Sequence, residues 1–283
     1  MWIMKPIDVF SLCIAILMGI LFLYYHFKYR KPEIFQREVS EYIPVIAWLR
    51  AGIFFCLFYL ISWGTGTMKV ILNSPIATSE QLADKRWWIW VIGLVVFILV
   101  AYWGIWARYT IRFDRKLDLF PQIVFGLLWG TAFGQSLLSL WRIPQLLAPA
   151  WEKWQQGLLA YVIIGVWQWF LMDMYWDIYI SPEHDSPKSI KLKTMCTHIP
   201  NVTLCLIFLA LYGNLVIFIA LQTLALVGCS INMRMPAPWS IEKTPPARRE
   251  QSMFWGLPRC GGYISDDPEN DLYLKAAHLS QGK

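Results

Sequence analysis

Stretches of about 20 residues without a charged side chain recur along this chain, and they constrain its fold more than any other feature. An α-helix of that length spans the hydrocarbon core of a bilayer. Only 16% of the 283 residues are charged and 57% are hydrophobic, whereas soluble domains carry about 25% charged residues. The stretches lack the alternation of barrel strands and are about twice as long. We therefore predict an all-α integral membrane protein.

Six windows are apolar enough to form transmembrane helices. They are about residues 9–27, 43–63, 87–107, 119–141, 158–179 and 199–233. The first window resembles a signal peptide, but no small-residue cleavage site follows it, so we interpret it as a span. The last window has 35 residues without a charge; it is tilted, projects from the bilayer, or breaks near Gly213–Asn214. Residues 1–233 are thus predicted to form a bundle of about six transmembrane helices.

The remaining residues, 234–283, differ in composition from the bundle. They are rich in proline and glycine and contain too few apolar residues to fold alone. Several aromatic side chains, among them Trp239, Phe254 and Tyr263, favour an extended arm that docks on a partner over a disordered end. We predict an extra-membrane, Pro-rich C-terminal arm.

Basic residues are unevenly divided between the predicted loops, and this predicts an orientation. Loops 28–50, 108–118 and 181–198 contain twelve Lys and Arg residues, whereas the N-terminus and the other short loops contain six. Cytoplasmic loops carry the excess of positive charge. With six spans, both termini are then predicted on the non-cytoplasmic side. The net charge of +6 lies beside apolar windows, which suits anionic lipid headgroups and argues against nucleic acid as a partner.

A glycine stripe and a large supply of tryptophan indicate how the helices associate. Gly126, Gly130 and Gly134 recur at intervals of four, so one helix face has no side chains to hold a neighbour away. Close packing within the bundle is the first interpretation, and a flat surface for a planar cofactor is the alternative. Many of the 17 tryptophans lie where interfacial anchors are expected. The glycine face and the C-terminal arm are also predicted contacts for other membrane subunits or for self-association.

The region that follows residue 168 has the most polar character within reach of the membrane. Asp173 and Asp177 are one helical turn apart, so both carboxylates share one face, and an ionised pair there needs a cation, a proton or a basic partner. We take these two residues as candidate catalytic groups.

His184, Asp185 and His198 follow, and a loop that folds back would bring them to the same membrane face. Carboxylate and imidazole ligands suit a divalent or transition metal. The predicted metal ligands are Asp173, Asp177, His184, Asp185 and His198. The competing interpretation is that the Asp pair lies at the interface, is partly solvated and pairs with loop lysines. No named metal-binding spacing distinguishes the two, and the cofactor is left unassigned.

Three functional hypotheses follow. The first is a membrane-embedded enzyme or enzyme subunit with a carboxylate and histidine site near the membrane face, acting on a lipophilic or small neutral substrate. The second is a non-catalytic subunit of a larger membrane complex, with or without a pigment or other cofactor. The third is a small transporter, although no inverted pair of broken helices is visible. Nucleotide-binding and serine-hydrolase motifs are absent from the sequence, which argues against ATP hydrolysis and serine hydrolysis.

Overall fold

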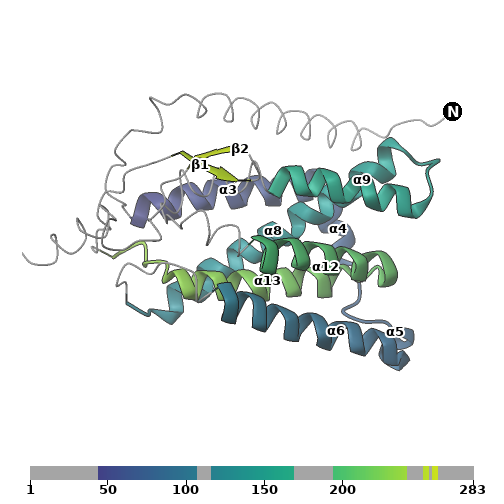
Figure 1. The fold of residues 1–283 in the computed structure, drawn as a ribbon, viewed down its shortest axis with the longest axis horizontal. Helices are drawn as coiled ribbons and strands as arrows, with labels where there is room; N and C mark the ends of the chain where they lie inside the picture. The colour runs from purple at the N-terminus through teal and green to yellow at the C-terminus, as the bar shows by residue number, and fades with distance from the viewer. Residues whose placement is uncertain (1–43, 107–115, 169–193, 241–250, 255–256, 261–283) are drawn as a thin grey trace, which may run out of the picture.

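The computed structural model describes residues 44–106, 116–168, 194–240, 251–254 and 257–260 (Figure 1). These residues are mainly helical. The helices are α3 (Pro44–Gly64), α4 (Thr67–Leu72), α5 (Ser79–Ala83), α6 (Lys85–Ile98), α8 (Leu119–Leu147), α9 (Lys153–Val166), α12 (Ile199–Tyr212) and α13 (Leu215–Met233). Two segments have π-helical hydrogen bonding: η1 (Leu99–Ile105) continues α6, and η4 (Thr194–His198) precedes α12. Strands β1 (Gln251–Phe254) and β2 (Leu257–Cys260) pair antiparallel.

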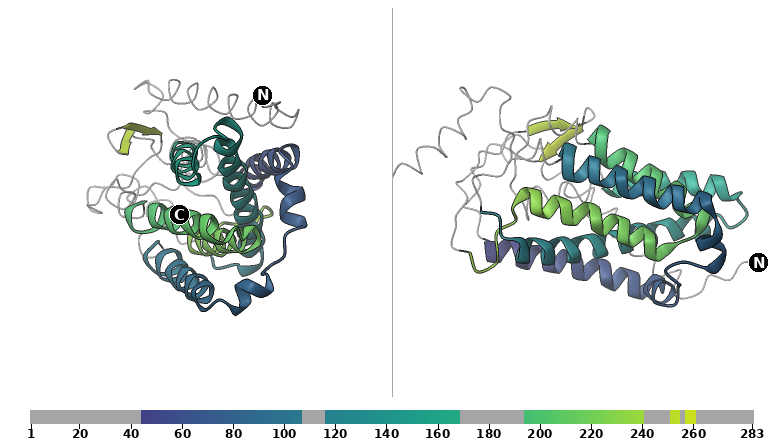
Figure 2. Two further views of the ribbon diagram at one scale, coloured as in Figure 1. Left: turned by 90° about the vertical axis from the view of Figure 1, so that its right-hand side faces the viewer. Right: turned by 90° about the horizontal axis from the view of Figure 1, so that it is seen from below.

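Four helical segments are long and apolar enough to cross a membrane, and they run roughly along one direction (Figure 2). They are Ala47–Gly64, Lys85–Ile105, Leu119–Gln145 and Leu215–Met233. They overlap four of the six predicted windows. The predicted window 9–27, and residues 169–179 of the fifth window, lie outside the described residues.

Of the three alternatives for the 199–233 window, the structure agrees with the break near Gly213–Asn214, where the chain turns back. Gly213 ends α12 in the left-handed conformation (φ 62°) that glycine adopts without strain. Asn214 then caps α13, since its side-chain oxygen accepts the Ile217 backbone N–H at 3.0 Å. Asn201 of α12 donates to the Gln222 side chain of α13 at 2.9 Å, so the two helices lie side by side as an antiparallel hairpin (Figure 1).

The loop before α6 holds this turn at one end of the bundle. Gln81 donates to the Tyr212 carbonyl at 3.0 Å, and Asn214 donates to the Ile76 carbonyl at 2.8 Å. We call this end, which contains residues 73–84 and 212–214, the turn end. The tight turn explains why a charge-free window of this length needs no polar loop, because neighbouring backbone and amide groups satisfy its hydrogen bonds.

The segment after α13 begins at the opposite end of the bundle. Trp48, near the start of α3, donates from its indole nitrogen to the Pro236 carbonyl at 2.8 Å. Asn232 donates to the Tyr102 carbonyl of η1 at 3.3 Å. We call this end, which contains the start of α3, the end of η1 and residues 232–238, the tail end.

The side of the membrane that the C-terminal arm faces stays a prediction, but its place relative to the basic loops differs from the six-span prediction. Its first residues share the tail end with the described parts of the three basic loops, residues 44–50, 116–118 and 194–198. The hairpin causes this difference. The 199–233 window was predicted as one span, but its two helices, α12 and α13, run along the bundle in opposite directions. The N-terminal segment lies outside the described residues.

The predicted close approach along the glycine stripe is present, and the neighbour is α13. A methyl group on Gly126 would lie 2.5 Å from the Val227 Cα, and one on Gly134 would lie 3.2 Å from the Ile219 Cα. At Gly130 the corresponding atom, the Thr223 Cα, is closer still. The two backbones are thus in direct contact over two turns. Helix α13 of the same chain therefore covers the glycine face of α8, and no room remains there for a planar cofactor.

Aromatic side chains fill the space between α3, α8 and α9. Phe125 of α8 packs edge-on against Trp48 and Phe55 of α3, with ring centroids 4.9 and 5.6 Å apart. Phe58 packs in the same manner against Trp167 at 5.7 Å. Edge-to-face pairs of this kind stabilise by about 0.5–1.5 kcal/mol beyond their buried area. They fix α3 against α8, which already holds α13, and the end of α9 against α3.

Gly130→Ala should destabilise the protein by about 1–3 kcal/mol, because the new methyl group meets backbone atoms that cannot move aside. Gly93→Ala in α6 is the matched control. Its methyl group enters open space, so the substitution should be neutral or stabilising by up to about 1 kcal/mol through helix propensity. Thermal unfolding of both variants in the same detergent measures the difference, and equal behaviour of the two would contradict the packing.

Single cysteines tested with a membrane-impermeant thiol reagent should report the two ends of the bundle. Ser240→Cys and Lys116→Cys, at the tail end, should label from one side of sealed membranes, and Ser79→Cys, at the turn end, from the other. The excess of basic residues in these loops predicts that the tail end faces the cytoplasm. Labelling of Ser240→Cys and Ser79→Cys from the same side would refute the hairpin.

Candidate functional site

Of the five predicted site residues, His198 is the one that the described part of the chain contains. It ends η4 and heads α12 at the tail end. Asp173, Asp177, His184 and Asp185 lie outside the described residues, so their convergence on His198 stays a prediction. Among the described residues, His198 contacts η1.

A hydrogen bond joins His198 to Tyr102 across two helical segments. The Tyr102 hydroxyl and the His198 Nδ1 are 3.2 Å apart, and the tautomer of the imidazole decides which atom donates. The two rings meet edge-on with centroids 5.6 Å apart. Tyr102 is 2% exposed and His198 is half-buried. The phenol therefore fixes the orientation of an imidazole that retains access to the surface.

Both partners belong to π-helical segments. Tyr102 lies within η1 and His198 is the last residue of η4. A π-helical turn inserts one residue into a helix and is less stable than a regular turn, so such turns persist mostly at functional sites. Here, the two irregular segments meet at the Tyr102–His198 bond, which is the feature of the described residues that most resembles a built site.

Hydrogen bonds hold η1 against helix α13. Asn232 donates both to the Tyr102 carbonyl at 3.3 Å and to the Gly228 carbonyl at 2.8 Å. Trp103 donates from its indole nitrogen to the Leu224 carbonyl at 3.1 Å. Gly228 makes room for that ring, since a methyl group there would lie 2.5 Å from the Trp103 Nε1. These contacts hold the irregular η1 backbone and, through it, Tyr102.

A chain of buried polar groups continues from His198 into the bundle. His198, Asn201 and Cys205 are spaced at i, i+3 and i+7, so they share one face of the helix. The Cys205 thiol donates to the Asn201 side-chain oxygen at 3.4 Å, and Asn201 donates to Gln222 at 2.9 Å. Both amides are almost completely buried, and the Gln222 Nε2 has no hydrogen-bond partner within the described residues.

The chemistry available at this site is that of a neutral or singly charged imidazole. In the described ranges, the completely buried polar side chains are amides and hydroxyls, and no Asp, Glu, Lys or Arg is among them. These ranges also contain no group of three His, Cys, Asp or Glu residues able to hold a metal ion. A metal at His198 would therefore need ligands from segments outside these ranges, as the sequence predicts for Asp173, Asp177, His184 and Asp185.

Sequence reasoning missed Tyr102, Asn232 and Gly228. Tyr102 lies in an apolar window that reads as a uniform span, and nothing in its neighbours signals a π-helical turn. The spacing of His198, Asn201 and Cys205 forms a polar stripe that can be recognised in the sequence. This stripe marks the face of α12 that makes the contacts described above. The chain matches no protein-family model, no curated protein and no solved structure.

Asn201→Leu should destabilise the protein by about 1–3 kcal/mol, because it leaves the buried Gln222 amide without its partner. Gln222→Met should have a similar effect on Asn201. The double variant should recover most of the loss, since two apolar side chains of similar size need no hydrogen bond. A double-mutant cycle measured by thermal unfolding tests this, and additive losses would contradict the amide contact.

Proposed function

We propose that the chain is a multi-span integral membrane protein. Four helices long and apolar enough to cross a bilayer support this, and the hairpin partner α12 adds a shorter apolar pass with η4. The outward faces of the long helices also carry large apolar side chains. Leu49, Ile53, Ile89 and Ile92 are each more than half exposed, which is unfavourable in water and suits contact with lipid.

Within that membrane protein, we propose a membrane-embedded enzyme or enzyme subunit that acts on a lipophilic or small neutral substrate. The Tyr102–His198 pair at the tail end carries the proposal. His198 serves there as the acid–base group or as a metal ligand, and Tyr102 is the positioning residue that holds its ring. Asp173, Asp177, His184 and Asp185 would complete the site from the neighbouring segment.

The neutral character of the site agrees with an uncharged substrate. Hydroxyl and amide groups surround the described side of His198, and no buried charge of the described residues would have to be matched by the substrate. The site also lies at the end of apolar helices, which suits a substrate that is dissolved in the lipid. An imidazole with a fixed orientation contributes about 10²–10⁴-fold to the rate of a reaction that it assists by proton transfer.

A non-catalytic subunit of a larger complex is the second candidate. The observation that favours it is the buried Asn201, whose side chain bonds to Gln222 and Cys205 of the same chain and thus has a structural role that needs no substrate. In this alternative the exposed apolar faces bind other subunits. Partners would contact surfaces other than the glycine stripe, since α13 covers that stripe within the chain.

His198→Gln should abolish function in cells that depend on the protein while leaving its abundance unchanged. The experiment complements a deletion strain with the wild type, His198→Gln, Tyr102→Phe or the control His278→Gln, and compares total lipids and small metabolites. The deletion and His198→Gln should accumulate the same substrate, with a loss of about 10²-fold or more. Tyr102→Phe should retain partial function, and His278→Gln full function.

Full complementation by His198→Gln would overturn the enzyme proposal and leave the assembly subunit. The metal content of the purified wild type and of His198→Gln then separates the two roles of the imidazole. A ligand role requires a stoichiometric metal in the wild type that is lost in the variant. An acid–base role requires no difference in metal content between them.

A further inference from the structure

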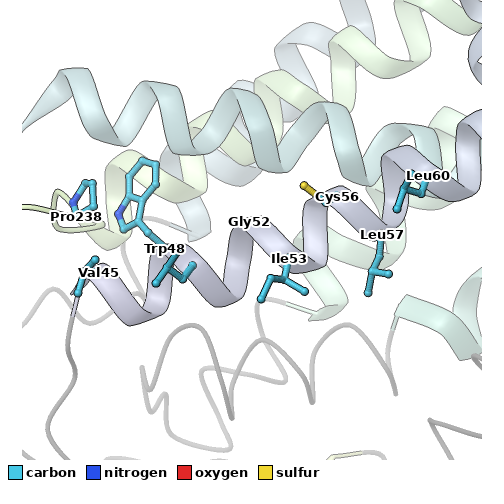
Figure 3. A pocket seen from close by; sticks show the side chains of 9 residues that line it. Val45, Trp48, Gly52, Ile53, Cys56, Leu57, Leu60 and Pro238 are labelled. Carbon is cyan, nitrogen blue, oxygen red and sulfur yellow. The ribbon is translucent and has the colours of Figure 1, made fainter.

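An apolar groove runs along the outer face of α3 (Figure 3). It has a volume of about 650 Å³. Its walls include Val45, Trp48, Ile53, Leu57 and Leu60, and Pro238 closes it at the tail end. Ile53 and Leu60 are 62% and 59% exposed, so no helix of the described residues covers this face of α3.

The floor of the groove is made of small residues. Gly52 and Cys56 are one turn apart on α3, and both line the groove. A methyl group on Gly52 would have no atom within 4 Å. This differs from Gly126, Gly130 and Gly134, whose bare faces are all filled by α13. Bare backbone on a membrane helix favours the close approach of a second helix.

We propose that residues 9–27 of the same chain occupy this groove as a helix antiparallel to α3. This segment is the apolar window that the sequence predicts as the first span, and its 19 residues match the 21 of α3. It is joined to the start of α3 by residues 28–43. This connection is rich in charged residues and does not cross the bilayer, so the two helices that it joins run antiparallel.

The two segments also agree in register. Ser11, Ala15 and Gly19 form a stripe of small residues at intervals of four. If residue 27 lies level with residue 44, the helical rise places Gly19 and Gly52 both about 12 Å from the tail end. The same rise places Ala15 and Cys56 at about 18 Å, and Ser11 and Leu60 at about 24 Å. Gly19 and Ala15 thus meet the floor of the groove, and Ser11 meets its wall at Leu60.

Cys56 provides a native reporter for this packing. In a Cys13→Ser background, Ala15→Cys should form a disulfide with Cys56 when membranes containing the full chain are treated with copper phenanthroline. A disulfide needs Cα atoms about 4.4–6.8 Å apart, so the yield should exceed that of the wild-type Cys13–Cys56 pair by about tenfold. Cys13 is two residues away, on nearly the opposite side of the helix.

A protease site inserted in the 28–43 connection makes the link visible. After cleavage, fragments joined by a disulfide stay together on a non-reducing gel. Cys56→Ser should abolish the link and Val96→Cys, an exposed position at similar depth on α6, should not restore it. The absence of a link in folded Ala15→Cys protein would show that lipid fills the groove and would overturn the proposal. Covalent dimers in place of an internal link would assign it to a second copy and equally overturn it.

Discussion

The direct backbone contact between α8 and α13 is the interaction on which the rest of the described structure depends. In a bilayer, burying apolar side chains between helices gains little, because lipid is equally apolar. Close packing of backbones and hydrogen bonds must then hold the helices together. Gly126, Gly130 and Gly134 allow this contact over two turns, and α8 also binds α3 through aromatic side chains such as Phe125.

The position of His198 follows from that contact through the hairpin. With α13 fixed on α8, the turn at Gly213–Asn214 returns α12 along α13, and the Asn201–Gln222 hydrogen bond sets their register. This register brings His198 level with the end of α13, where Asn232 holds the Tyr102 carbonyl. The Tyr102–His198 pair therefore depends on a glycine stripe that lies on a different helix and touches neither residue.

Much of the helical framework could be predicted from the sequence, because a charge-free window of about 20 residues has few alternatives. The windows 43–63, 87–107 and 119–141 correspond to α3, α6 with η1, and α8. The glycine stripe predicted a close contact, but its partner α13 could not be named, since spacing within one helix carries no information about its neighbour. The 199–233 window shows a second limit. Hydropathy gives the length of an apolar segment, but it does not show how many times that segment crosses the bundle. Gly213–Asn214 signalled a break, and only the contacts of Asn201 and Asn214 reveal that the chain reverses there.

The candidate site was predictable to a smaller extent. His198 could be named because a histidine at the head of an apolar window is conspicuous, and its polar face through Asn201 and Cys205 follows from helical periodicity. Tyr102 could not, because a π-helical turn has no sequence signature and shifts which residues face a neighbour. Asp173, Asp177, His184 and Asp185 remain predictions from the sequence.

Solid-state NMR of the protein in lipid bilayers, with glycine and threonine labelled with ¹³C, tests the α8–α13 contact most directly. The structure predicts a cross-peak between the Cα atoms of Gly130 and Thr223, because these backbones touch. Thr223→Ser should remove that peak and thereby assign it. Cross-peaks from Gly130 to lipid acyl chains, with none to Thr223, would show that the glycine face meets the bilayer and would contradict the fold on which the hairpin and the site depend.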